Sequence, residues 1–232
     1  MITIHKARAR GLTKIDWLES HHTFSFGDYY DPEHLGFRQL RVINEDTVKP
    51  GAGFPTHSHR DMEIISYVLE GALEHKDSLG NGSVIRPGEV QRMSAGKGIM
   101  HSEFNPSRTE PVHFLQIWIM PDQAGITPSY EQQVIDLSSA HGKFQPIAST
   151  KGGAGQVKLH QDSTMSVGML KAGEKLNHRL PSGRRAWLQL ARGAIALNGD
   201  ALEAGDAAAI DSDTELQIEA DRAAEMLLFD LA

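Results

Sequence analysis

The chain has 232 residues, 40% of them hydrophobic and 23% charged, which fits a folded protein with a substantial core. Its formal net charge of −7 repels phosphate backbones, so direct nucleic-acid binding is not expected. The chain contains no cysteine, which excludes disulfides and thiolate ligands. Any bound metal must therefore be held by nitrogen and oxygen atoms.

The N-terminal residues do not resemble a targeting segment. They lack the apolar stretch of a secretion signal. No apolar run in the chain approaches the roughly 18 residues that a membrane span requires. We therefore expect a cytoplasmic protein that does not cross or bind a membrane.

Residues 1–50 carry the pattern of short strands separated by turns. A short helix or turn is expected over Asp16–Ser20, and the segment His22–Phe26 alternates in the manner of a strand. A further strand is predicted over Leu40–Asn44, and Pro50-Gly51 has the composition of a turn.

Residues 51–121 form a dense series of predicted strands with glycines between them. The strands are expected over His57–Glu70, Leu73–Asp77 and Val112–Met120. Turns are expected at Gly71, Gly80–Gly82, Pro87–Glu89 and Gly96–Gly98. Short strands with regularly spaced turns predict an antiparallel barrel or sandwich.

Residues 121–155 have the composition of a connection between two halves. Lys143–Ser149 is a predicted strand and Lys151–Gly155 a flexible bend. The segment Glu131–Leu137 fits a strand or a short helix equally well. Short strands with the same glycine punctuation return over residues 156–232.

The second half repeats the pattern of the first. Leu188–Leu197, which contains Gly193, is similar to Tyr67–His75, which contains Gly71. The second copy keeps only one histidine, His178, where the first copy has a cluster. We therefore expect an all-β chain of two barrels: an N-terminal metal-binding domain over residues 1–130 and a C-terminal domain over 131–232 that has lost its ligands.

Two pairs of metal-capable residues stand in the first half with the same spacing. His57 and His59 form one pair, and His101 and Glu103 form the other. On a strand, residues two apart point to the same face. If the two strands are neighbours in one barrel, three imidazole nitrogens and one carboxylate oxygen can hold a divalent metal with positions left for substrate or dioxygen.

A single His-x-His pair is a weak signal, because histidines are often surface or structural residues. The second pair strengthens it, since burying several ionisable side chains without a partner is costly and a cation removes that cost. Glu63 is the rival fourth ligand or a hydrogen-bond partner of a ligating histidine. Asp61, His75 and Gln116 are weaker candidates for supporting the site. The remaining histidines lack ligand spacing.

The segment from Gly51 to Gly71, with His57, His59 and Glu63, resembles the first motif of the cupin superfamily. A longer set of segments is similar to the pirin family, in its bacterial quercetin-dioxygenase-like branch. These segments are His22–Phe26, Leu40–Asn44, His57–Glu63, Glu74–Ser78, Met93–Glu103 and Gln116–Trp118. The similarity is dense over about residues 1–130 and loose in the second half.

The resemblance implies a bicupin fold, in which two antiparallel β-barrels of the jelly-roll type pack in one chain with a single metal in the first. It implies the ligands His57, His59, His101 and Glu103, and it implies that Glu63 is not a ligand. Fe(II) is the favoured metal, with Mn, Co, Ni, Cu or Zn as alternatives.

The function that the resemblance implies for such a site is dioxygen-dependent cleavage of a flavonol such as quercetin, with release of carbon monoxide. Glu103 is the predicted catalytic base, which accepts the proton of the flavonol 3-hydroxyl. Two alternatives stay open: a non-catalytic, metal-dependent regulatory protein of the pirin type, and a dioxygenase for another small phenolic substrate. A monomer is expected, because the duplication supplies packing that single cupins obtain by dimerising.

Overall fold

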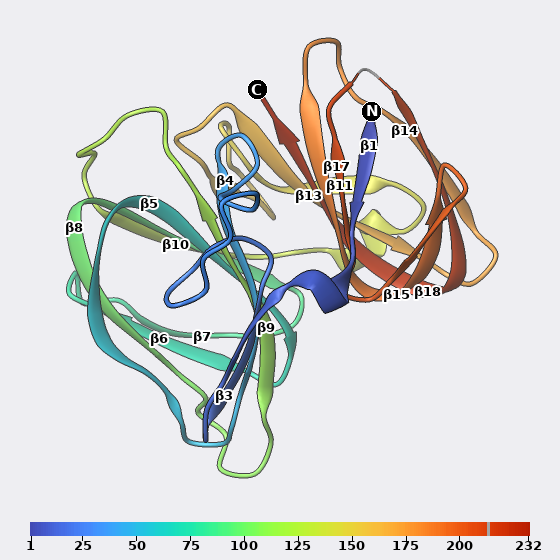
Figure 1. The fold of residues 1–232 in the computed structure, drawn as a ribbon. Coiled ribbons are helices and arrows are strands. Elements are labelled where there is room, and N and C mark those ends of the chain that lie inside the picture. The colour runs from blue at the N-terminus through green and yellow to red at the C-terminus, as the bar shows by residue number, and fades with distance from the viewer. Residues whose placement is uncertain (213) are drawn as a thin grey trace. The chain divides into compact units, whose positions relative to one another are not determined.

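The computed structural model describes residues 1–212 and 214–232, which form two compact units (Figure 1). The N-terminal unit comprises residues 10–135 and 151–161, and the C-terminal unit comprises residues 1–9, 136–150 and 162–232. Within the described residues, the regular elements are strands except for two 3₁₀ turns, η1 (Ala7–Ala9) and η2 (Leu137–Ala140). The predicted all-β class is confirmed, while the domain division at residue 130 stays a prediction.

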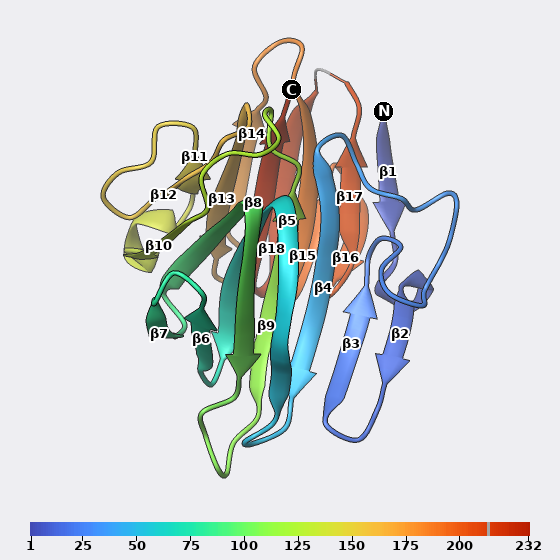
Figure 2. The ribbon, with the colours of Figure 1, turned by 90° about the vertical axis from the view of Figure 1, so that its left-hand side faces the viewer.

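A nine-stranded antiparallel sheet makes up most of the N-terminal unit (Figure 2). Its strand order is β2-β3-β4-β9-β5-β8-β6-β7, and β10 pairs with β8. The strands are β2 (Gly11–Lys14), β3 (Leu18–His22), β4 (Leu40–Val48), β5 (Gly53–Glu70), β6 (Leu73–Asp77), β7 (Gly82–Ile85), β8 (Glu89–Phe104), β9 (Val112–Ile119) and β10 (Ser129–Val134). The short strand β12 (Val157–Lys158) belongs to the same unit.

The segment Asp16–Ser20 holds a turn and no helix: the Ile15 backbone nitrogen donates to the Leu18 oxygen across it, and β3 begins at Leu18 and pairs with β2 and β4. One sequence prediction in this unit is wrong. Gly96–Gly98 does not separate two strands but lies inside β8, which runs unbroken past it. The undecided segment Glu131–Leu137 belongs to strand β10 as far as Val134, and the 3₁₀ turn η2 begins at its last residue, Leu137.

Gly96 and Asp61 form an irregularity in the pairing of β5 with β8. The register shifts between His59 and Asp61, and Asp61 lies opposite Gly96. Both residues have positive φ, 63° at Asp61 and 45° at Gly96. A Cβ at Gly96 would lie 2.0 Å from the backbone oxygen of Ile126. Glycine is required here because the loop before β10 packs directly on the strand, and β-bulges of this kind redirect neighbouring side chains.

The C-terminal unit contains a second antiparallel sheet. Its strands follow the order β1-β17-β15-β18-β13-β11, with β14 paired to β18 and β16 paired to β15. They are β1 (Ile2–His5), β11 (Phe144–Ser149), β13 (Ser163–Leu170), β14 (Lys175–Arg179), β15 (Arg185–Leu197), β16 (Asp200–Glu203), β17 (Ala207–Ile210) and β18 (Glu215–Leu231).

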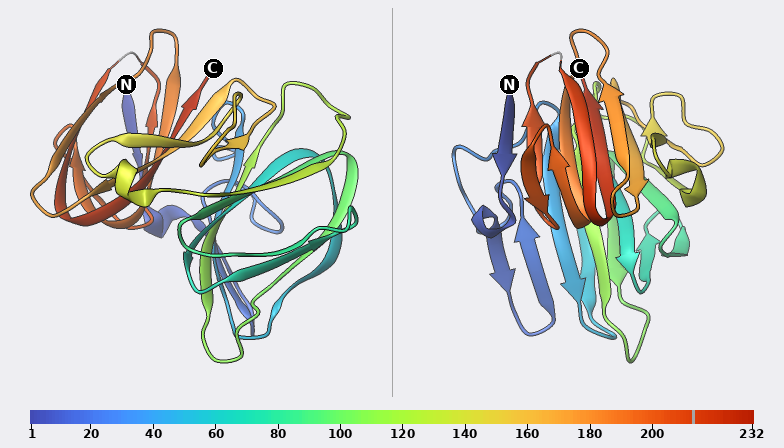
Figure 3. Two further views of the ribbon diagram at one scale, coloured as in Figure 1. Left: turned by 180° about the vertical axis from the view of Figure 1, so that it is seen from behind. Right: turned by 90° about the vertical axis from the view of Figure 1, so that its right-hand side faces the viewer.

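The first residues of the chain pair with the last third of it. Figure 3 shows the N-terminal strand β1 alongside β17, where Ile2 lies opposite Ile210. The connection after β1 is fixed to Asp206, which accepts hydrogen bonds from Lys6 Nζ at 2.8 Å and from the Ala7 backbone nitrogen at 2.7 Å. This long-range pairing leaves no local signal in the sequence.

The sequence repeat corresponds to a repeated structural feature, a glycine with positive φ at which another stretch of backbone comes close. Gly71 follows β5 and Gly193 lies within β15, with φ values of 74° and 86°. A Cβ at Gly71 would lie 2.5 Å from the Pro111 backbone oxygen, and one at Gly193 would lie 2.1 Å from the Ala223 oxygen. Each glycine therefore allows the backbone of another strand of the same sheet to approach closely.

Separate apolar clusters stabilise the two ends of the N-terminal sheet. One cluster contains seven buried residues, Leu18, Val48, Val68, Leu73, Ile85, Val112 and Phe114. The other contains Ile64, Met93, Ala95 and Ile99, with Met62 and Trp118 packed against it. Burial of each large apolar side chain contributes about 1.5–3 kcal/mol, so the clusters hold β5, β8 and β9 in fixed register.

Candidate metal centre

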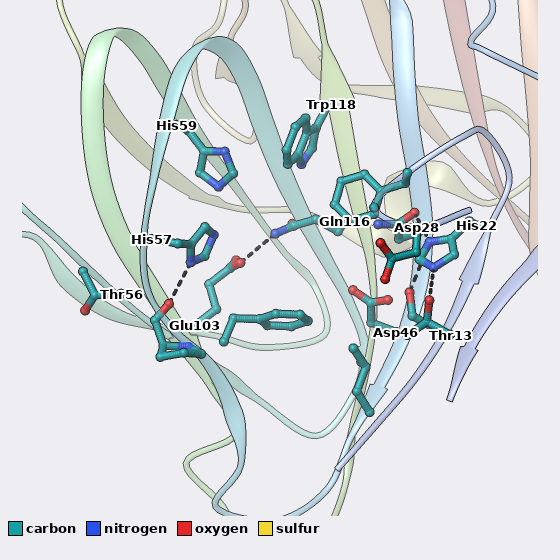
Figure 4. A pocket seen from close by; sticks show the side chains of 17 residues that line it. Thr13, His22, Asp28, Asp46, Thr56, His57, His59, Glu103, Gln116 and Trp118 are labelled. Atoms are coloured by element: carbon teal, nitrogen blue, oxygen red, sulfur yellow. Dashed lines mark hydrogen bonds between the residues drawn. The ribbon is translucent and has the colours of Figure 1, made fainter. Parts of the chain in front are cut away.

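The two pairs of predicted ligands lie on neighbouring strands. His57 and His59 belong to β5, His101 and Glu103 belong to β8, and His57 lies directly opposite His101 in the antiparallel register. Because side chains two residues apart share one face of a strand, each pair points to the same side of the sheet. Figure 4 shows His57, His59 and Glu103 directed into one cavity.

The three imidazole rings lie close together. Nε2 of His57 and Nε2 of His101 are 3.0 Å apart, and the ring of His59 is centred 4.7 Å and 4.9 Å from those two rings. Two nitrogens about 2.1 Å from one cation and at right angles to each other would be about 3.0 Å apart. The ligand atoms of the three histidines all lie within 4.8 Å of one another. The geometry therefore fits a shared cation.

Burial keeps two of these rings neutral. Burial, followed by the neighbouring histidines, lowers the pKa of His59 to about 4 and that of His101 to about 3. Nδ1 of His57 donates a hydrogen bond of 2.8 Å to the Pro55 carbonyl oxygen, which leaves Nε2 free to act as an electron-pair donor. Neutral imidazole is the form that binds a metal, so the donor set fits a divalent cation.

Glu103 lies beside this cluster, buried to 2% exposure. Its Oε2 accepts a hydrogen bond of 2.7 Å from Gln116 Nε2, and its Oε1 accepts one of 3.2 Å from Ser66 Oγ. Its carboxylate oxygen lies within 4.8 Å of ligand atoms of His101 and His75. His101 is therefore close both to the other two histidines and to Glu103. Ligation of one metal by all four residues stays a prediction.

His75 supports His101 from the side away from the triad. The two Nδ1 atoms are 3.4 Å apart, and Nε2 of His75 lies 3.1 Å from Asp77 Oδ2. Both side chains of the His75–Asp77 pair are fully buried. Although burial acts to raise the pKa of Asp77, hydrogen bonds from Asn81, His75 and Leu79 outweigh it and lower that pKa. An ionised Asp77 fixes the orientation of His75.

Glu63 is occupied elsewhere. It is fully buried, and its Oε1 lies 2.7 Å from Ser94 Oγ and 2.8 Å from His160 Nδ1. Its Oε2 accepts a hydrogen bond of 2.7 Å from the His160 backbone nitrogen. Glu63 therefore anchors the segment 151–161 to β5, a role of His160 that its sequence context did not predict. Asp61 likewise binds the Gly125 backbone nitrogen, at 2.7 Å.

A cavity of about 420 Å³ opens beside the cluster, within the size range of small-molecule sites. Its apolar walls come from Leu18, Phe26, Phe54, Pro55 and Trp118. Its polar lining also includes Thr13, Ser20, His22, Asn44 and Asp46. Figure 4 shows Thr13, His22 and Asp46 on the side away from His57 and His59. Sequence reasoning missed this polar side, because its residues come from three strands. Ser20/His22 and Asn44/Asp46 are each two residues apart, but neither pair consists of two metal-capable side chains.

The comparisons with known proteins agree with this architecture. Residues 4–119 match the family model described as Pirin, and residues 146–231 match the model described as Quercetinase C-terminal cupin domain. The fold and the two matched regions place the chain in the class of bicupin proteins. The chain belongs to the pirin family.

Individual relatives cover the whole chain. It is 48% identical over 231 residues to a protein of Escherichia coli (strain K12) named quercetin 2,3-dioxygenase, covering 100% of this chain and 99% of that protein. It matches a crystal structure of YhhW from Escherichia coli with a TM-score of 0.95 at 47% identity, covering 100% of this chain and 98% of that one. A structure of bacterial pirin YhhW in complex with nickel(II) gives 0.94 at 47% identity, with 100% and 99% covered.

These findings confirm the predicted resemblance to pirins and to proteins named quercetin 2,3-dioxygenase. They also confirm the bicupin class. Among the described residues, no helix is long and apolar enough to span a membrane. The predicted monomeric state and cytoplasmic location stay predictions.

Proposed function

We propose that this pirin is a metal-dependent dioxygenase that cleaves flavonols such as quercetin and releases carbon monoxide. The observation that carries the proposal is the meeting of three histidines at the wall of an aromatic-lined cavity. A relative of nearly equal length bears the name quercetin 2,3-dioxygenase, which supports the same substrate class.

His57, His59, His101 and Glu103 would hold one divalent cation. When bound, such a cation acts as a Lewis acid that lowers the pKa of a substrate hydroxyl and favours reaction of the ring with dioxygen. Nitrogen and oxygen donors of this kind suit Fe(II), and Mn, Co, Ni, Cu or Zn are alternatives. The related YhhW structure with nickel(II) supports binding of a divalent ion in a site of this family.

Glu103 is the proposed catalytic base. Its carboxylate is buried, lines the cavity and is held by Gln116 and Ser66, so it is oriented before substrate arrives. It would accept the proton of the flavonol 3-hydroxyl, since a carboxylate within hydrogen-bond reach of a hydroxyl acts as a general base. The hydrogen bonds to Gln116 and Ser66 limit rotation of the group between acceptance and release of the proton.

The cavity walls would orient the substrate and exclude water. Phe26 and Trp118 pack edge to face with ring centres 5.3 Å apart, and Trp118 packs in the same way on His59 at 4.9 Å. These rings form a continuous aromatic surface from the histidine cluster into the cavity, suited to a flat polyphenol. The overall reaction consumes one dioxygen and yields one carbon monoxide and a depside.

The test uses metal-loaded protein, with flavonol added under anaerobic conditions and air admitted afterwards. The expected result is a shift of the flavonol absorbance on binding, followed by bleaching, oxygen uptake and release of carbon monoxide. His59→Ala should abolish these signals, while His141→Ala, a partly exposed histidine of the C-terminal unit, should retain them. A metal-loaded protein that gives neither the shift nor the bleaching would favour the non-catalytic regulatory protein. Binding of flavonol without oxygen uptake would favour another phenolic substrate.

A further inference from the structure

The cavity has a second polar side, which the proposed metal chemistry does not use. Asp46 lies there on β4, in the strand order β4-β9-β5. Two strand spacings, about 10 Å measured along the sheet, separate β4 from the strand that carries His57 and His59. Figure 4 shows the Asp46 carboxyl group at the side of the cavity opposite those two histidines.

Asp46 is the group on this side with unused hydrogen-bonding capacity. It is 3% exposed, and its Oδ1 is buried with no hydrogen-bond partner among the described residues. The neighbouring His22 is fully used, since Nδ1 lies 2.8 Å from Asn44 Oδ1 and Nε2 lies 2.9 Å from Thr13 Oγ1. A buried carboxyl oxygen without a partner is costly, and a ligand that supplies the partner removes that cost.

The surroundings of Asp46 indicate the chemistry of that ligand. Apolar side chains of Leu18, Phe26, Phe54 and Trp118 line the same cavity, so a ligand that reaches Asp46 also contacts apolar and aromatic groups. Burial, assisted by the charges of Glu103 and Glu45 and opposed by Ser20, raises the pKa of Asp46 to about 7. A group that is partly protonated at neutral pH can both donate a hydrogen bond to a phenol oxygen and accept one from a phenol hydrogen.

We infer that Asp46 is a specificity-determining residue that binds a hydroxyl group on the aromatic ring of the substrate farthest from the metal. The inference rests on the proposed function, because it places the other end of a flavonol at the histidine cluster. It narrows the substrate class to polyphenols that carry a hydroxyl on the distal ring. A flavonol without that hydroxyl would leave Asp46 unpartnered and bind less tightly.

Anaerobic binding to metal-loaded protein tests this directly. The dissociation constants of quercetin and of 3-hydroxyflavone, which lacks every hydroxyl except the 3-hydroxyl, are measured by absorbance and by quenching of tryptophan fluorescence. Wild-type protein should bind quercetin about 10-fold more tightly. In Asp46→Ala that preference should fall to about 2-fold or less, through weaker binding of quercetin and not of 3-hydroxyflavone.

Two further variants sharpen the result. Asp46→Asn keeps the shape of the side chain and should retain part of the preference for quercetin over 3-hydroxyflavone. It provides the test if Asp46→Ala does not fold. Asp28→Ala removes an exposed carboxylate from the same cavity and should leave the preference unchanged, because that group is already hydrated.

The outcomes separate the two proposals. If both flavonols bind and the preference is the same in wild type, Asp46→Ala and Asp46→Asn, the role of Asp46 is refuted while the proposed function stands. If neither flavonol binds to metal-loaded wild type, the proposed function fails and the inference fails with it.

Discussion

His75 determines which nitrogen of His101 is available to the cluster. With its Nδ1 3.4 Å from Nδ1 of His75, His101 turns its Nε2 toward His57, 3.0 Å away. Nε2 of His75 donates to the ionised Asp77, so Nδ1 of His75 accepts a hydrogen bond from Nδ1 of His101. The lone pair of a neutral His101 then lies on Nε2, the nitrogen that faces His57.

Loss of His75 should weaken metal binding without abolishing it. His75→Ala removes the partner that orients His101, and loss of such a partner typically costs 10–100-fold in metal affinity, so a decrease of about that size is expected. Competition with a chelator of known affinity measures it. Asp77→Asn should cause a smaller loss in the same direction, and His141→Ala none. An unchanged affinity in both His75→Ala and Asp77→Asn would refute the role of the pair.

Glu103→Gln should separate catalysis from folding. The amide keeps the size of the side chain but cannot accept the substrate proton, so turnover at saturating flavonol should fall by about 100-fold or more. Elemental analysis of the same preparation measures how much metal remains. A Glu103→Ala variant that binds metal normally and cleaves flavonol at the wild-type rate would exclude Glu103 as the base.

Glu45 gives the N-terminal unit a pH-dependent stability. Its carboxylate lies 2.7 Å from Arg10 Nη1 and 2.9 Å from His113 Nε2. Burial acts to raise the pKa of Glu45, but His113 and Arg10 outweigh it and lower the pKa to about 2. A carboxyl whose pKa is lower in the folded state stabilises that state above its unfolded pKa, and this contribution disappears as pH falls through the folded pKa.

The Glu45→Gln variant should therefore lose on the order of 3 kcal/mol of unfolding free energy at pH 7. The difference in unfolding free energy between wild type and Glu45→Gln should shrink as pH falls from the ordinary pKa of glutamate, 4.5, toward the lowered pKa of about 2. Urea unfolding at several pH values measures both. The exposed Glu110→Gln serves as control and should show no such pH dependence. A Glu45→Gln deficit that is equal at low and neutral pH would contradict the assignment.

Gly96→Ala should destabilise the protein, because a Cβ would meet the Ile126 backbone oxygen at 2.0 Å and the positive φ is strained for alanine. A loss of about 3 kcal/mol is expected from strain and overpacking together. Gly82→Ala, on an exposed strand position with no atom closer than 4.0 Å, should change stability by about 0.5 kcal/mol or less. Thermal unfolding of the two variants gives the comparison, and equal losses would contradict the proposed close packing at Gly96.

The parts of the fold that sequence predicts well are those with local signals. β6 has the predicted bounds because turn residues, Gly71 and Gly80–Gly82, flank it closely on both sides. β9 differs by one residue, because its apolar run marks it as a strand. The pairing of β1 with β17 could not be predicted, since nothing local marks a partner about two hundred residues away. Gly96–Gly98 was misread because a glycine pair has the same composition in a turn and in a bulge.

The candidate site divides in the same way. His57, His59 and His101 could be identified from their spacing, and the structure brings them together. Asp46 could not be identified, because its role depends on which strands surround the cavity. His160 could not be identified either, because its partner Glu63 is almost one hundred residues away in the sequence. Isolated acidic or histidine residues of this kind have no pattern to distinguish them from surface positions.

The most direct test of the metal centre is a crystal structure of metal-loaded protein with anomalous scattering recorded at the absorption edge of the metal. The account predicts one strong peak about 2.1 Å from Nε2 of His57 and of His101, bounded also by His59 and by the Glu103 carboxylate. A peak coordinated by His75, or no peak in the N-terminal unit of fully loaded protein, would contradict it.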